Sequence, residues 1–345
     1  MTSDWSFHNK QLPCQSTSPK LALFLCLVAA ALLAMLFGSK STKRHGNDDK
    51  QPEDLIAILD FFEKLDKIST HDERGKNLGM TIRYLDQFTK QSIRMRQMED
   101  RDGCQDDTFS VMHVKMIEAA MLAVKIYHHE DKVIYMALTV LTIIVNGHDA
   151  IQRPLWEDPS SNHIEFIITV LRNSLNRAKM DDNPSENNER LSAEVQRKGC
   201  LFLGGFDNID ASAKIIELGG LHAINDAIQW YRFHAGVCKW GLWAAFNLCY
   251  DRPKHQLAFV QIGGVQSVCQ CLKNNATCAD VARHGIAILF DIMRETAENA
   301  ETSTQAKMIG FREDLQDLLI ESMDNFPKDV EIRMMIQQIL GTAKR

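Results

Sequence analysis

The sequence predicts an all-α fold built from repeated helical units, on two observations. From Asp54 onward the apolar residues recur with the spacing of amphipathic helices, and no comparable stretch alternates in the manner of a strand. One apolar pattern also returns at even intervals, in "GCLFLGGFDN", "GLWAAFNLCY" and "GIAILFDIMR". These stretches begin at Gly199, Gly241 and Gly285, and steps of 42 and 44 residues are typical of a repeat architecture.

The composition favours a chain that is folded over most of its length. Of 345 residues, 45% are hydrophobic and 24% are charged, which is too apolar for a mainly disordered protein. The 39 basic residues are outnumbered by 45 acidic ones, so the net charge of −6 gives no electrostatic footprint for nucleic acid. We therefore expect no nucleic acid among the partners.

The nine cysteines are odd in number and widely spaced, and Cys200, Cys238 and Cys249 fall inside apolar helical patterns. Free cysteine in such a position behaves as a small hydrophobe, which favours reduced thiols and a cytosolic location. The cluster of Cys269, Cys271 and Cys278 lacks the paired spacing of a structural zinc site, so we expect no metal there.

The run from Leu21 to Gly38, "LALFLCLVAAALLAMLFG", contains no charged residue and follows a tail at 1–20. Its 18 residues would span about 27 Å as a helix, so we expect a single-pass transmembrane helix at 21–38. A cleaved signal peptide is the alternative. Its apolar region is usually about 7–15 residues long and ends in small residues, whereas Leu36 and Phe37 stand at the exit here.

The flanking charges favour a cytosolic repeat domain, because three basic residues directly follow the run and two precede it. The sequon Asn275-Ala276-Thr277 fits a lumenal domain instead, although such triplets also occur by chance. Residues 39–53 form a polar linker, and the repeat domain is expected at 54–345.

The first part of this domain is expected to be a helix, because five apolar residues form one stripe. They are Leu55, Ile58, Leu59, Phe62 and Leu65. Farther on, the polar run from Lys179 to Arg190 predicts an exposed loop between two helices.

The repeat has a common register when the three glycines are taken as position zero and Ala137 marks a fourth copy. Offsets −4, +1, +4 and +7 are apolar in every copy. They are Val133, Val195, Val237 and Val281; Leu138, Cys200, Leu242 and Ile286; Leu141, Leu203, Ala245 and Leu289; Ile144, Phe206, Leu248 and Ile292. Because these offsets lie on one side of a helix, each copy should bury that side of a long helix, and a small residue at zero should allow close approach.

Paired glycines precede two of these helices, in "KIIELGGLHAINDAI" and "AFVQIGGVQSVCQCL". Gly219-Gly220 and Gly263-Gly264 are 44 residues apart, and each pair predicts a sharp turn from one helix into the next. The expected unit is therefore a short helix, a glycine turn, a medium helix, a polar loop and a long helix.

This layout, together with "IELGGLHAINDAI … GLWAAFNLC", resembles the armadillo-repeat family, most closely over 190–295. The resemblance implies a right-handed α-solenoid whose long helices line a concave protein-binding groove. With the N-terminal transmembrane helix, the layout is similar to armadillo proteins tethered to the mitochondrial outer membrane; the endoplasmic reticulum is the other expected location.

In that family a Trp and an Asn four residues later hold an extended peptide, and Trp243 and Asn247 match this pair. Only one copy carries it, since the equivalents of Trp243 are Thr139, Leu201 and Ala287. The alternative is that Trp243 is a packed helix residue and that Asn247 caps or bridges a neighbouring helix.

Trp240 lies one turn before Trp243, outside the shared apolar positions, and is expected to be exposed. Lys198 and His284 are its equivalents in the adjoining copies and would take an acidic or carbonyl group of a partner, while Asp291 would supply the opposite charge. The predicted partner-binding residues are Trp240, Trp243, Asn247, Lys198, His284 and Asp291.

The sequence contains no phosphate-binding glycine loop with lysine, no zinc-spaced histidine pair and no nucleophile elbow. We therefore expect no catalytic residue and no cofactor, and favour a membrane-anchored adaptor that binds a protein or an extended peptide. Two alternatives stay open: an armadillo-like nucleotide-exchange regulator of a heat-shock chaperone in the secretory pathway, and an enzyme whose site is assembled from distant residues.

Overall fold

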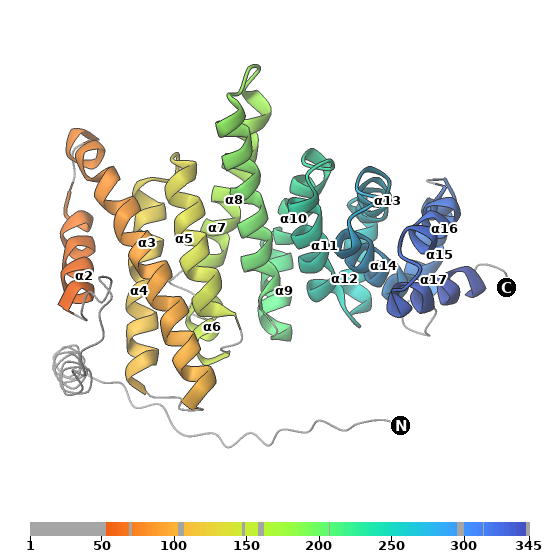
Figure 1. Cartoon of the computed structure of the whole chain (residues 1–345), viewed down its shortest axis with the longest axis horizontal. Coiled ribbons are helices and arrows are strands. Elements are labelled where there is room, and N and C mark those ends of the chain that lie inside the picture. Colours follow the sequence, from red (N-terminus) through yellow and green to blue (C-terminus); the bar gives the residue numbers. More distant parts are fainter. Residues whose placement is uncertain are drawn as a thin grey trace. The chain divides into compact units, whose positions relative to one another are not determined.

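The computed structural model describes residues 53–68, 71–102, 107–146, 149–157, 162–206, 208–294, 300–312 and 314–342 (Figure 1). The described residues form helices, turns and loops and contain no strand, which confirms the all-α class. The predicted transmembrane helix at 21–38 lies outside them. Among the helices that are described, none combines the length and the apolar character needed to cross a bilayer.

The chain divides into two compact units, Met1–Asp60 and Phe61–Arg345. The described part of the first is the start of α2 (Glu53–Asp66). In the second unit, Phe62 and Leu65 of the predicted stripe are buried. The remaining helices are α3 (His71–Asp102), α4 (Asp107–Ile126), α5 (Asp131–Val145), α6 (Asp149–Trp156), α7 (His163–Met180), α8 (Glu186–Gly204), α9 (Ile209–Glu217), α10 (Gly220–Trp230), α11 (Ala235–Cys249), α12 (Pro253–Gln261), α13 (Gly264–Asn274), α14 (Ala279–Met293), α15 (Ala300–Arg312), α16 (Leu315–Asn325) and α17 (Val330–Thr342).

The predicted three-helix unit is present twice with the same helix lengths. Helices α9, α10 and α11 have 9, 11 and 15 residues, and α12, α13 and α14 repeat these lengths. Gly219 and Gly263, with φ of 81° and 83°, stand at the start of α10 and α13. Because a side chain would strain this left-handed conformation, the glycine pairs make the sharp turns that the sequence predicts.

The long helices pack against one another in chain order, and we call α5, α8, α11, α14 and α17 the ladder helices (Figure 1). The medium helices α7, α10, α13 and α16 form a second row beside them, each in contact with the next. The core therefore runs between these two rows of helices.

The burial of side chains along the ladder helices confirms the register that the sequence predicts. Every residue at offsets −4, +1, +4 and +7 in the four copies is at most 2% exposed. The glycines at position zero make room for a side chain of the medium helix in the same unit. A Cβ atom at Gly199 would lie 2.3 Å from Leu171, and one at Gly241 would lie 2.5 Å from Ile228.

The polar run from Lys179 to Arg190 is exposed, but most of it is helical rather than a loop. Helix α7 continues to Met180 and α8 already begins at Glu186. The N–H of Asn188 donates to the Ser185 hydroxyl at 3.2 Å, which caps α8. Acidic residues in the first turn add a favourable interaction with the helix dipole, so composition alone misplaces this boundary.

The cysteines expected to behave as small hydrophobes do so, since Cys200, Cys238 and Cys249 are at most 2% exposed. Burial raises the pKa of the Cys200 thiol to about 12, so it stays protonated at neutral pH. Cys269 and Cys271 are buried as well. In the described part of the chain, no group of three or more His, Cys, Asp or Glu residues is arranged to hold a metal ion.

The sequon asparagine has a structural role. Asn275 is 8% exposed. Its amide donates to the carbonyl oxygens of Arg232 at 2.9 Å and Cys271 at 3.0 Å. This amide therefore ties the end of α13 to the loop before α11.

Asn275→Asp should lower the melting temperature, because an ionised carboxylate cannot donate these buried hydrogen bonds. Thr277→Ala removes the same sequon at an exposed position and should leave the melting temperature unchanged. Thermal unfolding of the two variants and of the wild type measures the difference. Equal stability of Asn275→Asp and Thr277→Ala would contradict the structural role.

Candidate functional site

The exposed side of the ladder helices carries the predicted site, and the structure brings its two tryptophans together on α11. Trp240 and Trp243 are both half-buried, so Trp240 is less exposed than the sequence predicts. Their rings meet edge to face with centroids 5.5 Å apart, and the Lys239 ammonium lies 4.8 Å from the Trp240 centroid. The three side chains form one aromatic surface, which we call the tryptophan surface.

Trp243 and Asn247 both contact the C-terminal end of α8. The Asn247 amide donates to the Gly204 carbonyl oxygen at 3.0 Å. A Cβ atom at Gly204 would lie 2.6 Å from the Ala244 Cα atom and 2.8 Å from Trp243 Cζ3. Asn247 therefore bridges two ladder helices, as the alternative interpretation of the sequence proposed, and holds the edge of the tryptophan surface in place.

Asp291 has an internal role and does not present a free charge to a partner. It is 4% exposed. Its Oδ2 atom accepts from the Asp251 backbone N–H at 3.0 Å and from the Gln256 amide at 2.7 Å. Asp251 has a φ of 53°, so the carboxylate fixes the left-handed turn after α11. We remove Asp291 from the predicted partner-binding set for this reason.

Lys198 and His284 lie on the ladder helices to either side of α11, and both are half-buried. The Lys198 ammonium lies 5.9 Å from the Tyr135 ring centroid on α5. Burial lowers the pKa of Lys198 and also that of His284. His284 is therefore mainly neutral at pH 7 and can donate or accept a hydrogen bond without carrying a full charge.

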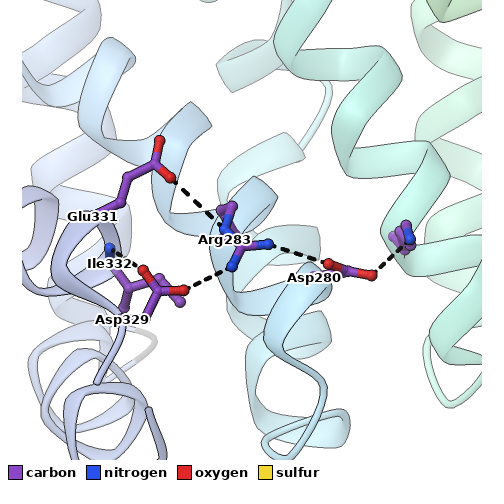
Figure 2. Close-up of polar contacts among 6 residues, drawn as sticks. Asp280, Arg283, Asp329, Glu331 and Ile332 are labelled. Carbon is purple, nitrogen blue, oxygen red and sulfur yellow. Dashed lines mark hydrogen bonds and ion pairs between the residues drawn. The ribbon is translucent and has the colours of Figure 1, made fainter. Parts of the chain in front are cut away.

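A chain of ion pairs crosses three ladder helices beside the tryptophan surface (Figure 2). The Lys239 ammonium lies 2.6 Å from Asp280, and Arg283 lies 3.2 Å from the same carboxylate. Figure 2 shows Arg283 reaching from Asp280 toward Asp329 and Glu331, at 2.7 and 3.8 Å. This series of ion pairs holds Lys239 beside Trp240, and sequence reasoning missed it because its links between helices join residues more than 40 positions apart.

A second exposed aromatic surface lies at the ends of α7 and α10. Trp230 is 46% exposed, Phe233 is 69% exposed and Met180 is 80% exposed. Lys179 and Arg232 place their cations 5.8 and 5.0 Å from the Trp230 and Phe233 ring centroids. In the sequence, this surface could have been recognised from the aromatic stretch "WYRFH", which stands where the repeat layout predicts a polar loop.

No protein family, no curated protein and no solved structure matches this chain. What the site can bind therefore has to be argued from its own geometry. Fixed aromatic rings with a neutral histidine and a cation beside them can hold an apolar side chain and bond to the backbone or side chains of a protein segment.

Stability should depend on pH through Asp291, because burial raises the pKa of this carboxyl. The unfolded value is about 3.9, so the folded state binds the proton more tightly than the unfolded state. Lowering the pH from 7 toward 4 should therefore stabilise the wild type relative to Asp291→Asn, whose amide oxygen keeps both acceptor contacts without a charge. Melting temperatures of the two proteins across this range measure the effect.

Asp291→Ala is the matched variant, because it removes the acceptor altogether. It should be less stable than Asp291→Asn at every pH, by about 1–3 kcal/mol. Loss of stability of the wild type relative to Asp291→Asn on acidification would show that the folded-state pKa is lowered and would contradict this account.

Proposed function

We propose that this protein is a non-enzymatic, membrane-anchored adaptor that binds an extended protein segment on the exposed side of its ladder helices. The observation that supports it most is the tryptophan surface. The ring centroids of two half-buried indoles lie 5.5 Å apart, and the adjacent side chains of Asn247 and Lys239 bond to Gly204 and Asp280 on the neighbouring ladder helices. Aromatic anchors that are already ordered bind a partner at a low entropic cost.

We further propose that the fold is a right-handed armadillo-like solenoid, with the ladder helices lining its groove. The repeated helix lengths of 9, 11 and 15 residues and the positive φ of Gly219 and Gly263 support this assignment. A partner segment would place an apolar side chain on Trp240 and Trp243, while His284 and Lys198 bond to its polar groups. With a single Trp–Asn pair, the site offers one strong anchor.

Trp240→Ala should weaken binding of such a segment at least about 30-fold, because truncating an aromatic anchor commonly costs about 2 kcal/mol or more. Peptides selected from a random display library on the full chain in detergent provide the ligands, and their dissociation constants provide the measurement. Trp230→Ala is the matched control, since it removes an exposed tryptophan from the other aromatic surface. Selected peptides that bind Trp240→Ala and Trp230→Ala equally well would contradict the proposed site.

The anchor and its orientation are proposed from the uncharged run at 21–38 and the basic residues that follow it. Carbonate extraction should leave the full chain in the membrane fraction, and protease added to sealed vesicles should digest the repeat domain. Release by carbonate would exclude the anchor. A protease-protected domain would favour the chaperone-regulator alternative in the secretory pathway.

A further inference from the structure

Charge is unevenly balanced where α5 packs on α8. Asp131, the first residue of α5, accepts from Arg177 at 2.5 Å and from the Ser174 hydroxyl at 3.0 Å. Glu194 on α8 forms an ion pair with Arg197, whose Nε atom lies 3.0 Å from both carboxylate oxygens. Each of these two carboxylates is therefore already paired with an arginine.

Two lysines at the same place have no such partner. Lys132 and Lys198 make no ion pair within 4.0 Å among the described residues. Both lie near Tyr135 instead, with their ammonium groups 5.5 and 5.9 Å from its ring centroid. An aromatic face attracts a cation but neutralises none of its charge, so two ammonium groups without a direct ion-pair partner lie near one half-buried ring.

The two lysines differ in burial: Lys132 is exposed, whereas Lys198 is half-buried, which is less common for lysine. Burial is the main cause that lowers the pKa of Lys198, the neighbouring Arg197 charge adds to it, and the Glu194 carboxylate partly opposes it. An ammonium that is partly removed from water and lacks a counter-ion is stabilised when an anion binds beside it. By contrast, the lysine of the tryptophan surface, Lys239, is paired with Asp280.

We propose that Lys132, Lys198 and Tyr135 form an anion-binding site that takes a carboxylate or phosphate side chain of the same protein segment that lies on the tryptophan surface. We call it the lysine cradle. This proposal rests on the proposed function, and it adds the chemistry and the direction of the partner. The two ammonium groups donate charge-assisted hydrogen bonds to the anion, and the Tyr135 ring holds both lysines near it.

The direction follows from the opposite charge on the other side of Trp240. There Asp280, Asp329 and Glu331 outnumber Lys239 and Arg283 (Figure 2). Packed helices lie about 8–10 Å apart, and an extended chain advances about 3.3 Å per residue. Lys198 lies one helix from Trp240 and Lys132 lies two helices away. In the bound segment, the anionic residue should therefore lie about three to six residues from the apolar one, in the direction of α5.

Selection from a random peptide display library tests the cradle within the full chain. The wild type and the control Lys254→Gln, which alters an exposed lysine on α12, should select peptides with Asp or Glu at the stated distance on one side of an apolar residue. The double variant Lys132→Gln/Lys198→Gln should keep the apolar preference and lose the acidic one. It should bind the peptides selected on the wild type about tenfold more weakly. Charge reversal, Lys198→Glu, should shift the preference toward basic residues.

The outcomes separate the two proposals. Peptides that depend on Trp240 but show no acidic preference would overturn the cradle and leave the adaptor function standing. Peptides that show no dependence on Trp240 would instead overturn the proposed function.

Lysine acetylation by an activated ester tests the cradle without any peptide, and mass spectrometry gives the rate at each lysine. Inorganic phosphate at constant ionic strength should slow acetylation of Lys132 and Lys198, while Lys254 should react at its usual rate. Equal protection by phosphate and acetate would assign a carboxylate ligand, and much stronger protection by phosphate would assign a phosphorylated one. Acetylation rates of Lys132 and Lys198 that neither phosphate nor acetate changes would overturn the cradle.

Discussion

The structure depends on the burial of one continuous side of the ladder helices. Residues at four offsets in four successive copies are almost fully removed from water, at no more than 2% exposure. Burial at this density is the dominant favourable contribution to folding, and it fixes the rotation of α5, α8, α11 and α14 about their axes. Once that rotation is fixed, Trp240, Trp243 and Lys198, at offsets −1 and +2, lie away from the buried side and are half-buried.

Polar side chains then hold neighbouring units in register. The Arg172 guanidinium donates to the Gly219 carbonyl oxygen at 2.9 Å, and the Asn225 amide donates to the Ile262 carbonyl oxygen at 3.0 Å. In both cases a medium helix bonds the glycine turn of the next unit. Because a hydrogen bond forms only over a narrow range of distances, these bonds favour one spacing between units.

The amino-acid sequence was sufficient to predict features that depend on local spacing. The apolar offsets predicted the buried side of each ladder helix, and the glycine pairs predicted turns that proved to have positive φ at Gly219 and Gly263. Both are properties of a few consecutive residues, so they can be recognised without knowledge of the tertiary structure. The tryptophans fell on one face for the same reason.

Features that depend on distant partners were not predictable in this way. Asp291 was expected on the surface, yet it is buried and accepts from the backbone N–H of Asp251, 40 residues earlier. A bridge from Asn247 to a neighbouring helix was one interpretation of the sequence, but its partner Gly204, 43 residues away, could not be named from spacing. The lysine cradle depends on which of several cationic side chains pairs with each carboxylate. Spacing along one helix does not indicate which ion pairs form.

Photo-cross-linking from the exposed side of the ladder helices tests the central claim most directly. Ala287 occupies the position equivalent to Trp243 on α14 and is half-buried, whereas Ala213 is exposed on the short helix α9. A photoreactive amino acid at position 287 of the full chain in cells should give discrete protein adducts that Trp240→Ala abolishes, and the same group at position 213 should not. Adducts from position 213 alone, or adducts from 287 that persist in Trp240→Ala, would contradict the account.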